Sequence, residues 1–153
     1  MFDFHTDRDE PETDLHRLQV ATHEVAHYLV WSAMPDARIT RVWVRGRGTS
    51  AHGMCSVDWR AETPDQDRDY LVGLLAGCVA DDLFSDAHPG FRCRRSGQSP
   101  DLAVFRKIRR RHEPSRAWSE RQLRDTAERL LRADWDRVER LALTLADRGR
   151  LKV

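Results

Sequence analysis

A segment that is apolar on nearly every side, residues 67–85, constrains the fold of this chain most. It carries six large apolar residues at helical spacing: Tyr70, Leu71, Leu74, Leu75, Val79 and Leu83. A helix with this pattern must be covered by other elements over most of its surface, because exposed apolar area is unfavourable in water. Gly73 and Gly77 lie one turn apart within it, which allows another backbone to approach closely. We therefore expect a fold built around a helix that is packed in the core.

The rest of the chain predicts more helices and one small sheet. Apolar residues at helical spacing predict helices over residues 14–33 and 119–147. Ser99 as N-cap and Pro100 as the first helical residue predict another helix, which runs to about Arg111. Short β-branched and aromatic runs predict two strands, over residues 38–45 and 53–59. We expect a polar loop through Pro64 before the core helix, a bend near Asp134 and a helix end at Gly149. Residues 1–13 are polar and acidic and predict a flexible lead-in, which leaves residues 14–153 as a single domain of the mainly α (α+β) class.

The charge balance and the cysteines narrow the setting in which the chain works. Of its 153 residues, 26 are Lys or Arg and 25 are Asp or Glu, which gives a net charge of +1. We therefore expect neither nucleic acid nor a membrane surface as a partner, because a chain so balanced has no strong overall field. Three cysteines without a C-x-x-C spacing favour a reducing compartment, and the acidic start lacks the basic and apolar regions of a signal peptide. Since no run of about 18 apolar residues occurs, we expect a cytoplasmic protein without a membrane-spanning helix.

The first predicted helix contains His23-Glu24-Val25-Ala26-His27, an H-E-x-x-H sequence. Two histidines at positions i and i+4 of a helix share one face, so both imidazoles can reach one tetrahedral zinc ion. Glu24 lies one position further round the helix and can accept a proton from a water molecule on that metal. About one in sixty shuffled chains of this composition would contain the pattern. The alternative is a charged, solvent-facing helix with two unrelated histidines, and the helical context favours the metal.

Three further segments accompany this motif in a characteristic order. They are residues 44–47 (VRGR), residues 75–84 (LAGCVADDLF) and residues 96–102 (SGQSPDL), the last of which begins a helix. Together with the H-E-x-x-H sequence they resemble the peptidase domain of the FtsH family, the M41 metallopeptidases, over about residues 14–148. That family has a P-R-G-R stretch, a Gly-rich apolar helix ending in an acidic pair, and a T-T-G-A-x-N-D-L type segment in the same order.

The resemblance implies a zincin-like fold and a zinc-dependent endopeptidase that cuts peptides or unfolded protein. It implies His23, His27 and Asp101 as the zinc ligands and Glu24 as the general base. From the residues alone, Asp101 is an acid in the first turn of a helix, a position that the helix dipole already favours. A set of two histidines and one carboxylate also suits iron, so the choice of zinc comes from the resemblance.

The chain departs from the family pattern at three places. Val25 and Ala26 replace the family's Ala and Gly, Pro100 stands where the family has Asn, and Asp81-Asp82 replace a Glu pair. The alternative hypothesis is therefore a non-catalytic, metal-binding regulatory or interaction module that keeps the peptidase fold. For Asp81 and Asp82 two roles stay open, a solvated helix end or a carboxylate that orients a ligand histidine.

The sequence also bears on partners. It has no G-x-x-x-x-G-K-[ST] phosphate loop, so the ATPase module of the resembled family would have to be a separate partner. The family's hexamers leave a homo-oligomer open. We expect a substrate to lie along the edge of the small sheet, near residues 38–59.

A run of basic residues follows the core helix. It predicts a solvated face or a subunit contact rather than a nucleic-acid site, and its members are Arg92, Arg94, Arg95, Arg106, Lys107, Arg109, Arg110 and Arg111.

Overall fold

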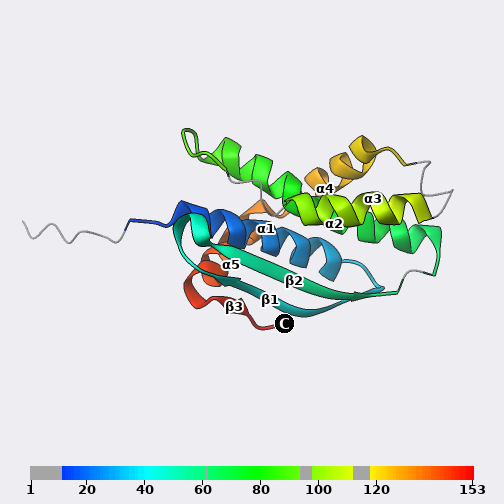
Figure 1. Ribbon diagram of the computed structural model, residues 1–153, viewed down its shortest axis with the longest axis horizontal. Helices are drawn as coiled ribbons and strands as arrows, with labels where there is room; N and C mark the ends of the chain where they lie inside the picture. The colour runs from blue at the N-terminus through cyan, green and yellow to red at the C-terminus, as the bar shows by residue number, and fades with distance from the viewer. Residues whose placement is uncertain (1–11, 61, 94–97, 112–117) are drawn as a thin grey trace, which may run out of the picture.

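The computed structural model describes residues 12–60, 62–93, 98–111 and 118–153. In chain order its elements are α1 (Leu15–Ser32), β1 (Ala37–Arg45), the short 3-10 helix η1 (Gly48–Ser50), β2 (His52–Trp59), α2 (Pro64–Ala87), α3 (Gln98–Arg111), α4 (Glu120–Ala133), α5 (Trp135–Arg148) and β3 (Arg150–Leu151). The predicted class, mainly α with one small sheet, is confirmed (Figure 1). Most of the predicted lead-in and the basic residues Arg94 and Arg95 lie outside the described residues. Within the described ranges, no helix is both long and apolar enough to cross a membrane.

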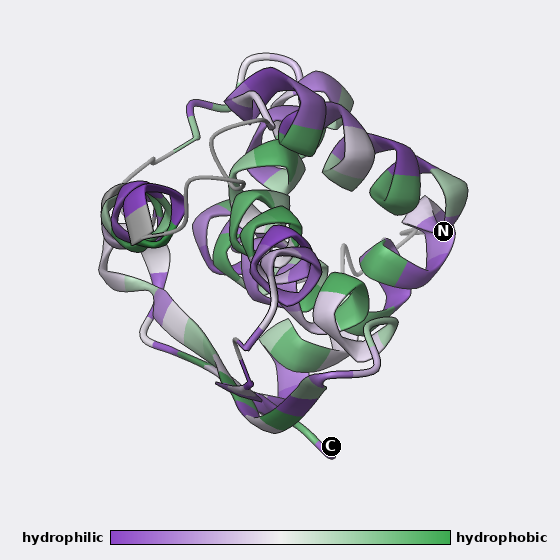
Figure 2. Cartoon of the chain, turned by 90° about the vertical axis from the view of Figure 1, so that its right-hand side faces the viewer, coloured by the Kyte–Doolittle hydropathy of each residue, from purple (hydrophilic) through white to green (hydrophobic). Residues whose placement is uncertain are grey.

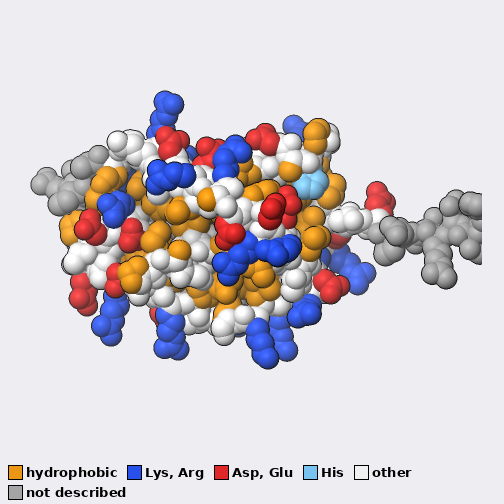
Figure 3. Space-filling model, turned by 180° about the vertical axis from the view of Figure 1, so that it is seen from behind, with side chains coloured by type: hydrophobic (Ala, Val, Ile, Leu, Met, Phe, Trp, Pro, Cys, Tyr) orange, Lys and Arg blue, Asp and Glu red, His pale blue; other side chains and the backbone are white. Residues whose placement is uncertain are grey.

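Helix α2 is enclosed by other helices, as its all-round apolar pattern predicts. It packs against α1, α3 and α4, while α1 also contacts the sheet and α5 (Figure 1). One cluster of buried apolar side chains draws on all five helices and on β1. Figure 2 shows apolar segments gathered toward the middle of the molecule, with hydrophilic segments mostly outside. The face seen from behind mixes apolar side chains with charged ones of both signs (Figure 3).

The sheet is antiparallel, with strand order β2-β1-β3. Strand β1 pairs with β2 along its whole length, with one irregularity between Ile39 and Arg41. Strand β3 pairs with β1 at only two positions and was not predicted, because two residues carry no strand pattern. Val42 and Val44 of β1 are buried, so they face the helices and their neighbours along the strand face outward. Strand β2 lies at the edge of the sheet, in the region where a substrate was expected.

Two helix starts and one helix break differ from the prediction. Helix α2 begins earlier than expected, at Pro64, because Thr63 and Gln66 each bond the other's backbone N–H in a capping box. Proline suits this first turn, where its missing N–H would have no helical partner. The polar loop predicted through Pro64 therefore ends at Thr63, one residue before the helix begins. Helix α3 begins at Gln98, two residues before the predicted first residue Pro100, and the bend predicted near Asp134 is a full break between α4 and α5.

Candidate metal centre

His23 and His27 lie one turn apart on the side of α1 that packs against α2. They are buried, at 5% and 3% exposure. Helix α2 has Gly77 at this contact, where a Cβ atom would lie 2.5 Å from ring atoms of both histidines. Any larger residue would push the rings aside, so the glycine makes room for two imidazoles. The close approach expected at Gly77 is thus that of side-chain rings rather than of another backbone.

The Nε2 atoms of both histidines converge with one carboxylate oxygen of Asp101. His23 Nε2 and His27 Nε2 are 3.1 Å apart, and Asp101 Oδ2 lies 3.1 Å from the first and 3.0 Å from the second. Asp101 comes from the first turn of α3, so the tertiary fold brings it to the motif. Among the described residues, these three form the only group of His, Cys, Asp and Glu close enough to hold a metal ion.

The other ring nitrogens of the two histidines are already engaged. His27 Nδ1 lies 2.7 Å from the carbonyl oxygen of Gly73, and it donates, because a carbonyl can only accept. His23 Nδ1 likewise donates to Oδ2 of Asp81 at 3.1 Å. With the proton on Nδ1, each neutral ring directs the lone pair of Nε2 toward the other ring and toward Asp101. Three lone pairs that face one another favour a cation between them.

Two glutamine side chains hold the carboxylate of Asp81. Gln19 Nε2 donates to its Oδ1 at 3.2 Å and Gln98 Nε2 donates to its Oδ2 at 2.9 Å, and the residue is 2% exposed. A solvated helix end is therefore wrong for Asp81, which contacts His23. Asp82 is exposed, but α2 continues past it to Ala87. The sequence analysis missed both glutamines. Gln19 stands four residues before His23, so helical spacing offered a signal for it, whereas Gln98 comes from another helix and gave none.

The pKa values of His23 and Asp101 shift in directions that favour positive charge between the three converging side chains. Burial alone would lower the pKa of His23, but Asp101 and Asp81 outweigh it and raise that pKa well above its usual value. Burial alone would raise the pKa of Asp101, but its bonds to His23 and His27 outweigh it and hold that pKa well below the usual range. Burial raises the pKa of Glu24, against the opposing effect of the two histidines.

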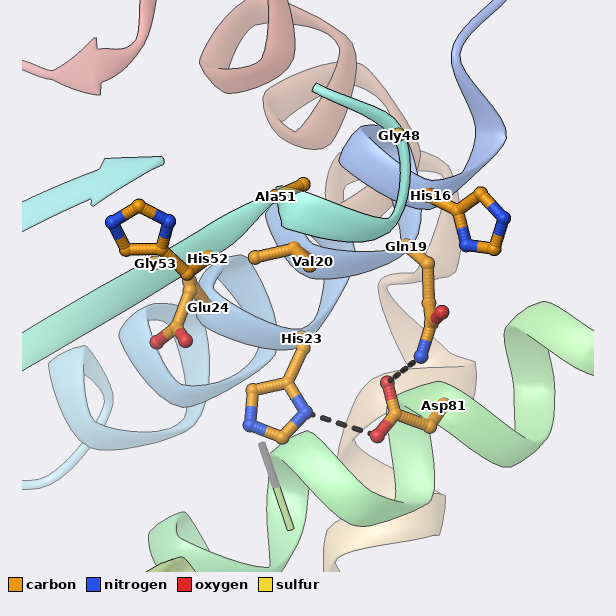
Figure 4. A pocket seen from close by; sticks show the side chains of 10 residues that line it. All are labelled: His16, Gln19, Val20, His23, Glu24, Gly48, Ala51, His52, Gly53 and Asp81. Carbon is orange, nitrogen blue, oxygen red and sulfur yellow. Dashed lines mark hydrogen bonds and ion pairs between the residues drawn. The ribbon is translucent and has the colours of Figure 1, made fainter. Parts of the chain in front are cut away.

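Glu24 stands apart from the three converging atoms and lines a cavity beside them. The cavity measures about 200 Å³ and lies between α1, the start of β2 and α2 (Figure 4). His23 and Glu24 of α1 line it together with His52 and Gly53 of β2. Glu24 is 8% exposed, and a Cβ atom on Gly53 would lie 3.0 Å from its side chain. Strand β2 thus approaches Glu24 at a glycine. His16 and His52 also line the cavity, although the sequence did not indicate a role for either.

The donor set fits a zinc ion. Ligand atoms bound tetrahedrally at about 2.0–2.2 Å lie about 3.3 Å apart, close to the 3.0 and 3.1 Å separations observed here. Each histidine also has a second partner that fixes its ring, as metal-binding histidines commonly do. Three protein ligands leave one tetrahedral position for water or substrate, which is the pattern of catalytic rather than structural zinc.

Comparison with known proteins adds no family to this description. No protein-family model matches the chain, and a search of curated proteins gives no match.

Proposed function

We propose that this chain is a zinc-dependent metalloendopeptidase of the M41 type with a zincin-like domain. The observation that carries the proposal is the convergence of His23 Nε2, His27 Nε2 and Asp101 Oδ2, beside a cavity lined by Glu24. The order of the motifs along the chain supports the same family. Three cysteines, none of them in a disulfide, suit a cytoplasmic setting.

The binding residues divide into ligands and groups that orient them. His23, His27 and Asp101 would hold the ion, and a zinc ion there would lower the pKa of a water molecule to about 7 and polarise a peptide carbonyl. Asp81 fixes the ring of His23, and the carbonyl of Gly73 fixes the ring of His27. These bonds place a proton on each Nδ1 and aim each Nε2 at the centre, so both rings are oriented to bind a metal through Nε2.

Glu24 is the general base in this proposal. Its carboxylate accepts a proton from the attacking water while the water oxygen bonds to the peptide carbonyl carbon. As the C–N bond breaks, Glu24 returns that proton to the leaving amine. Burial raises the pKa of Glu24, which brings its basicity closer to what proton transfer near neutral pH needs.

The substrate would be a peptide or an unfolded segment of a protein. Strand β2 lies at the sheet edge with Gly53 against Glu24, so an extended chain added to β2 would pass the cavity. A separate ATPase partner that unfolds proteins would widen the range of substrates, and a homo-oligomer is compatible with this arrangement.

The test is hydrolysis of a quenched-fluorescent unfolded protein by zinc-loaded parent and by Glu24→Gln. We expect the variant to bind zinc normally and to lose about 10²- to 10⁴-fold in rate, because it lacks only the base. The matched control is Glu62→Gln, at an exposed residue away from the cavity, which should keep the parent rate. Equal rates for parent and Glu24→Gln would refute the peptidase. Tight zinc binding with no hydrolysis of any unfolded protein would favour the non-catalytic metal-binding module.

A further inference from the structure

Four arginines line a groove on the outer face of the sheet. The groove measures about 550 Å³ and runs over β1 and the turn from α5 into β3. Arg41 and Arg45 come from β1, Arg148 from the last turn of α5 and Arg150 from β3, and all four are exposed. The sequence did not indicate this group, because its members lie on three elements that only the fold brings together; Arg45 alone belongs to a segment quoted above, residues 44–47.

The strand register explains why the arginines gather. Val42 and Val44 face the helices, so Arg41, Trp43 and Arg45 project from the opposite face of β1. Arg150 is paired with Trp43 across the β1–β3 ladder and joins the same face. Gly149, with a φ of 79°, lets the chain turn sharply between α5 and β3, which brings Arg148 beside them.

Within the described part of the chain, no acidic group neutralises the positive charge of this groove. No acidic residue lines it, and none of the four guanidinium groups forms an ion pair or a side-chain hydrogen bond with any described residue. Other arginines of the chain do have such partners, for example Arg124 with Glu120 and Arg132 with Glu128. Like charges held close together without counter-charges favour an anionic partner.

The surroundings of Trp43 favour an acidic polypeptide over single-stranded nucleic acid as the anionic partner. Trp43 is covered by the guanidinium of Arg45, 4.8 Å from its ring centre, and its ring meets the His52 ring edge-on at 5.6 Å. Single-stranded nucleic acid is bound by a series of open aromatic faces on which successive bases stack. One tryptophan that is already covered does not provide such a series. Arginine forks also bind carboxylates through two parallel hydrogen bonds, so an acidic polypeptide fits this groove better.

His52 links the groove to the candidate metal centre. It packs against Trp43 on the outer face, and it also lines the cavity that contains Glu24. An extended chain that leaves the groove at Arg45 therefore reaches His52, its partner across the β1–β2 ladder, and then the cavity. The path runs around the free edge of β2.

We infer that the groove lined by Arg41, Arg45, Arg148 and Arg150 binds an acidic segment of the polypeptide substrate and directs the neighbouring extended segment past His52 into the cavity at Glu24. This inference rests on the proposed peptidase function for the cutting step. The binding step stands on the groove alone.

Binding is measured first, by fluorescence anisotropy of a labelled peptide of alternating Glu and Ser on the full chain. We expect Arg41→Glu combined with Arg150→Glu to weaken binding about tenfold or more, because two attractions become repulsions. The matched control reverses two exposed arginines of α4, Arg121→Glu with Arg129→Glu, and should change binding less than about twofold. Should the change in β3 disturb folding, Arg41→Gln with Arg148→Gln leaves the ladder intact and should still weaken binding.

Hydrolysis then tests the link to the centre. An unfolded substrate that carries the Glu-Ser segment should show a higher KM and an unchanged kcat in the groove variants, whereas a Gln-Ser version should show no difference. Equal peptide binding by groove variants and parent would overturn the inference while the peptidase proposal stood. Absence of hydrolysis with intact, groove-dependent peptide binding would overturn the peptidase proposal instead. Tighter groove-dependent binding of a single-stranded oligonucleotide of equal charge would overturn the choice of an acidic polypeptide.

Discussion

The two sides of α1 are buried by different kinds of contact. The side that faces α2 carries His23 and His27, whose rings touch a glycine and whose four ring nitrogens all have defined partners. The opposite side carries Ala21 and Val25, which are fully buried and purely apolar. Both sides are buried away from water. The polar side chains need hydrogen-bond partners when they are buried, whereas the apolar ones do not. Buried polar groups are often no better for stability than apolar residues of similar size. We therefore propose that the polar side serves to bind a metal ion, whereas the apolar side serves folding.

The largest effect on zinc binding is expected from a substitution at Gly77. In Gly77→Ala the new methyl group would lie 2.5 Å from both imidazoles, so one or both rings must move. We expect about a hundredfold loss of zinc affinity, because displaced ligands no longer meet at one point. Competition with a chromogenic chelator measures the affinity. Parent-like affinity in a folded Gly77→Ala protein would show that the rings do not need this space.

A smaller effect is expected at Asp81. Asp81→Asn keeps the size of the side chain but removes the charge that holds the Nδ1 proton of His23. We expect about tenfold weaker zinc binding in the same assay. Asp82→Asn, at the exposed neighbour, provides the matched control and should bind zinc as the parent does. If the two variants lost affinity equally, the contact between Asp81 and His23 would not be what orients the ring.

The smallest effect on zinc is expected from the apolar side. Val25→Ala lies inside the motif but removes two buried methyl groups on the far side of the helix. We expect the free energy of unfolding to fall by about 2 kcal/mol, measured by urea denaturation with the metal removed, and the zinc affinity of the folded protein to stay unchanged. A fall in zinc affinity as large as that of Asp81→Asn would mean that the two sides of α1 are not independent.

The sequence predicted those parts of the fold that depend on local pattern. Helical spacing located α1 and α5 closely, and the all-round apolar pattern identified α2 as the enclosed helix. The start of α2 was missed because a capping box at Thr63 and Gln66 extends the helix into a polar segment. Strand β3 was missed because its two residues form a strand only by pairing with β1, and two residues show no strand pattern in the sequence.

The same distinction holds for the candidate site. His23, Glu24 and His27 follow from one helix and could be read from their spacing. The prediction of Asp101 as a metal ligand came from the family resemblance. The local sequence does not distinguish a metal ligand from an acidic residue that is favoured in the first turn of a helix. Gln98 and the arginine groove depend on contacts between distant segments, which no short pattern records.

The central proposal is one metal ion held by three residues, so the metal content of the purified chain tests it most directly. Elemental analysis of untagged parent, His27→Ala and Asp101→Ala proteins after zinc supplementation gives the number of zinc ions per chain, with circular dichroism to check that each variant is folded. We expect about one zinc per chain in the parent and almost none in either variant, because each variant removes one of three ligands. A parent without zinc, or an Asp101→Ala variant that keeps it, would contradict the three-ligand centre.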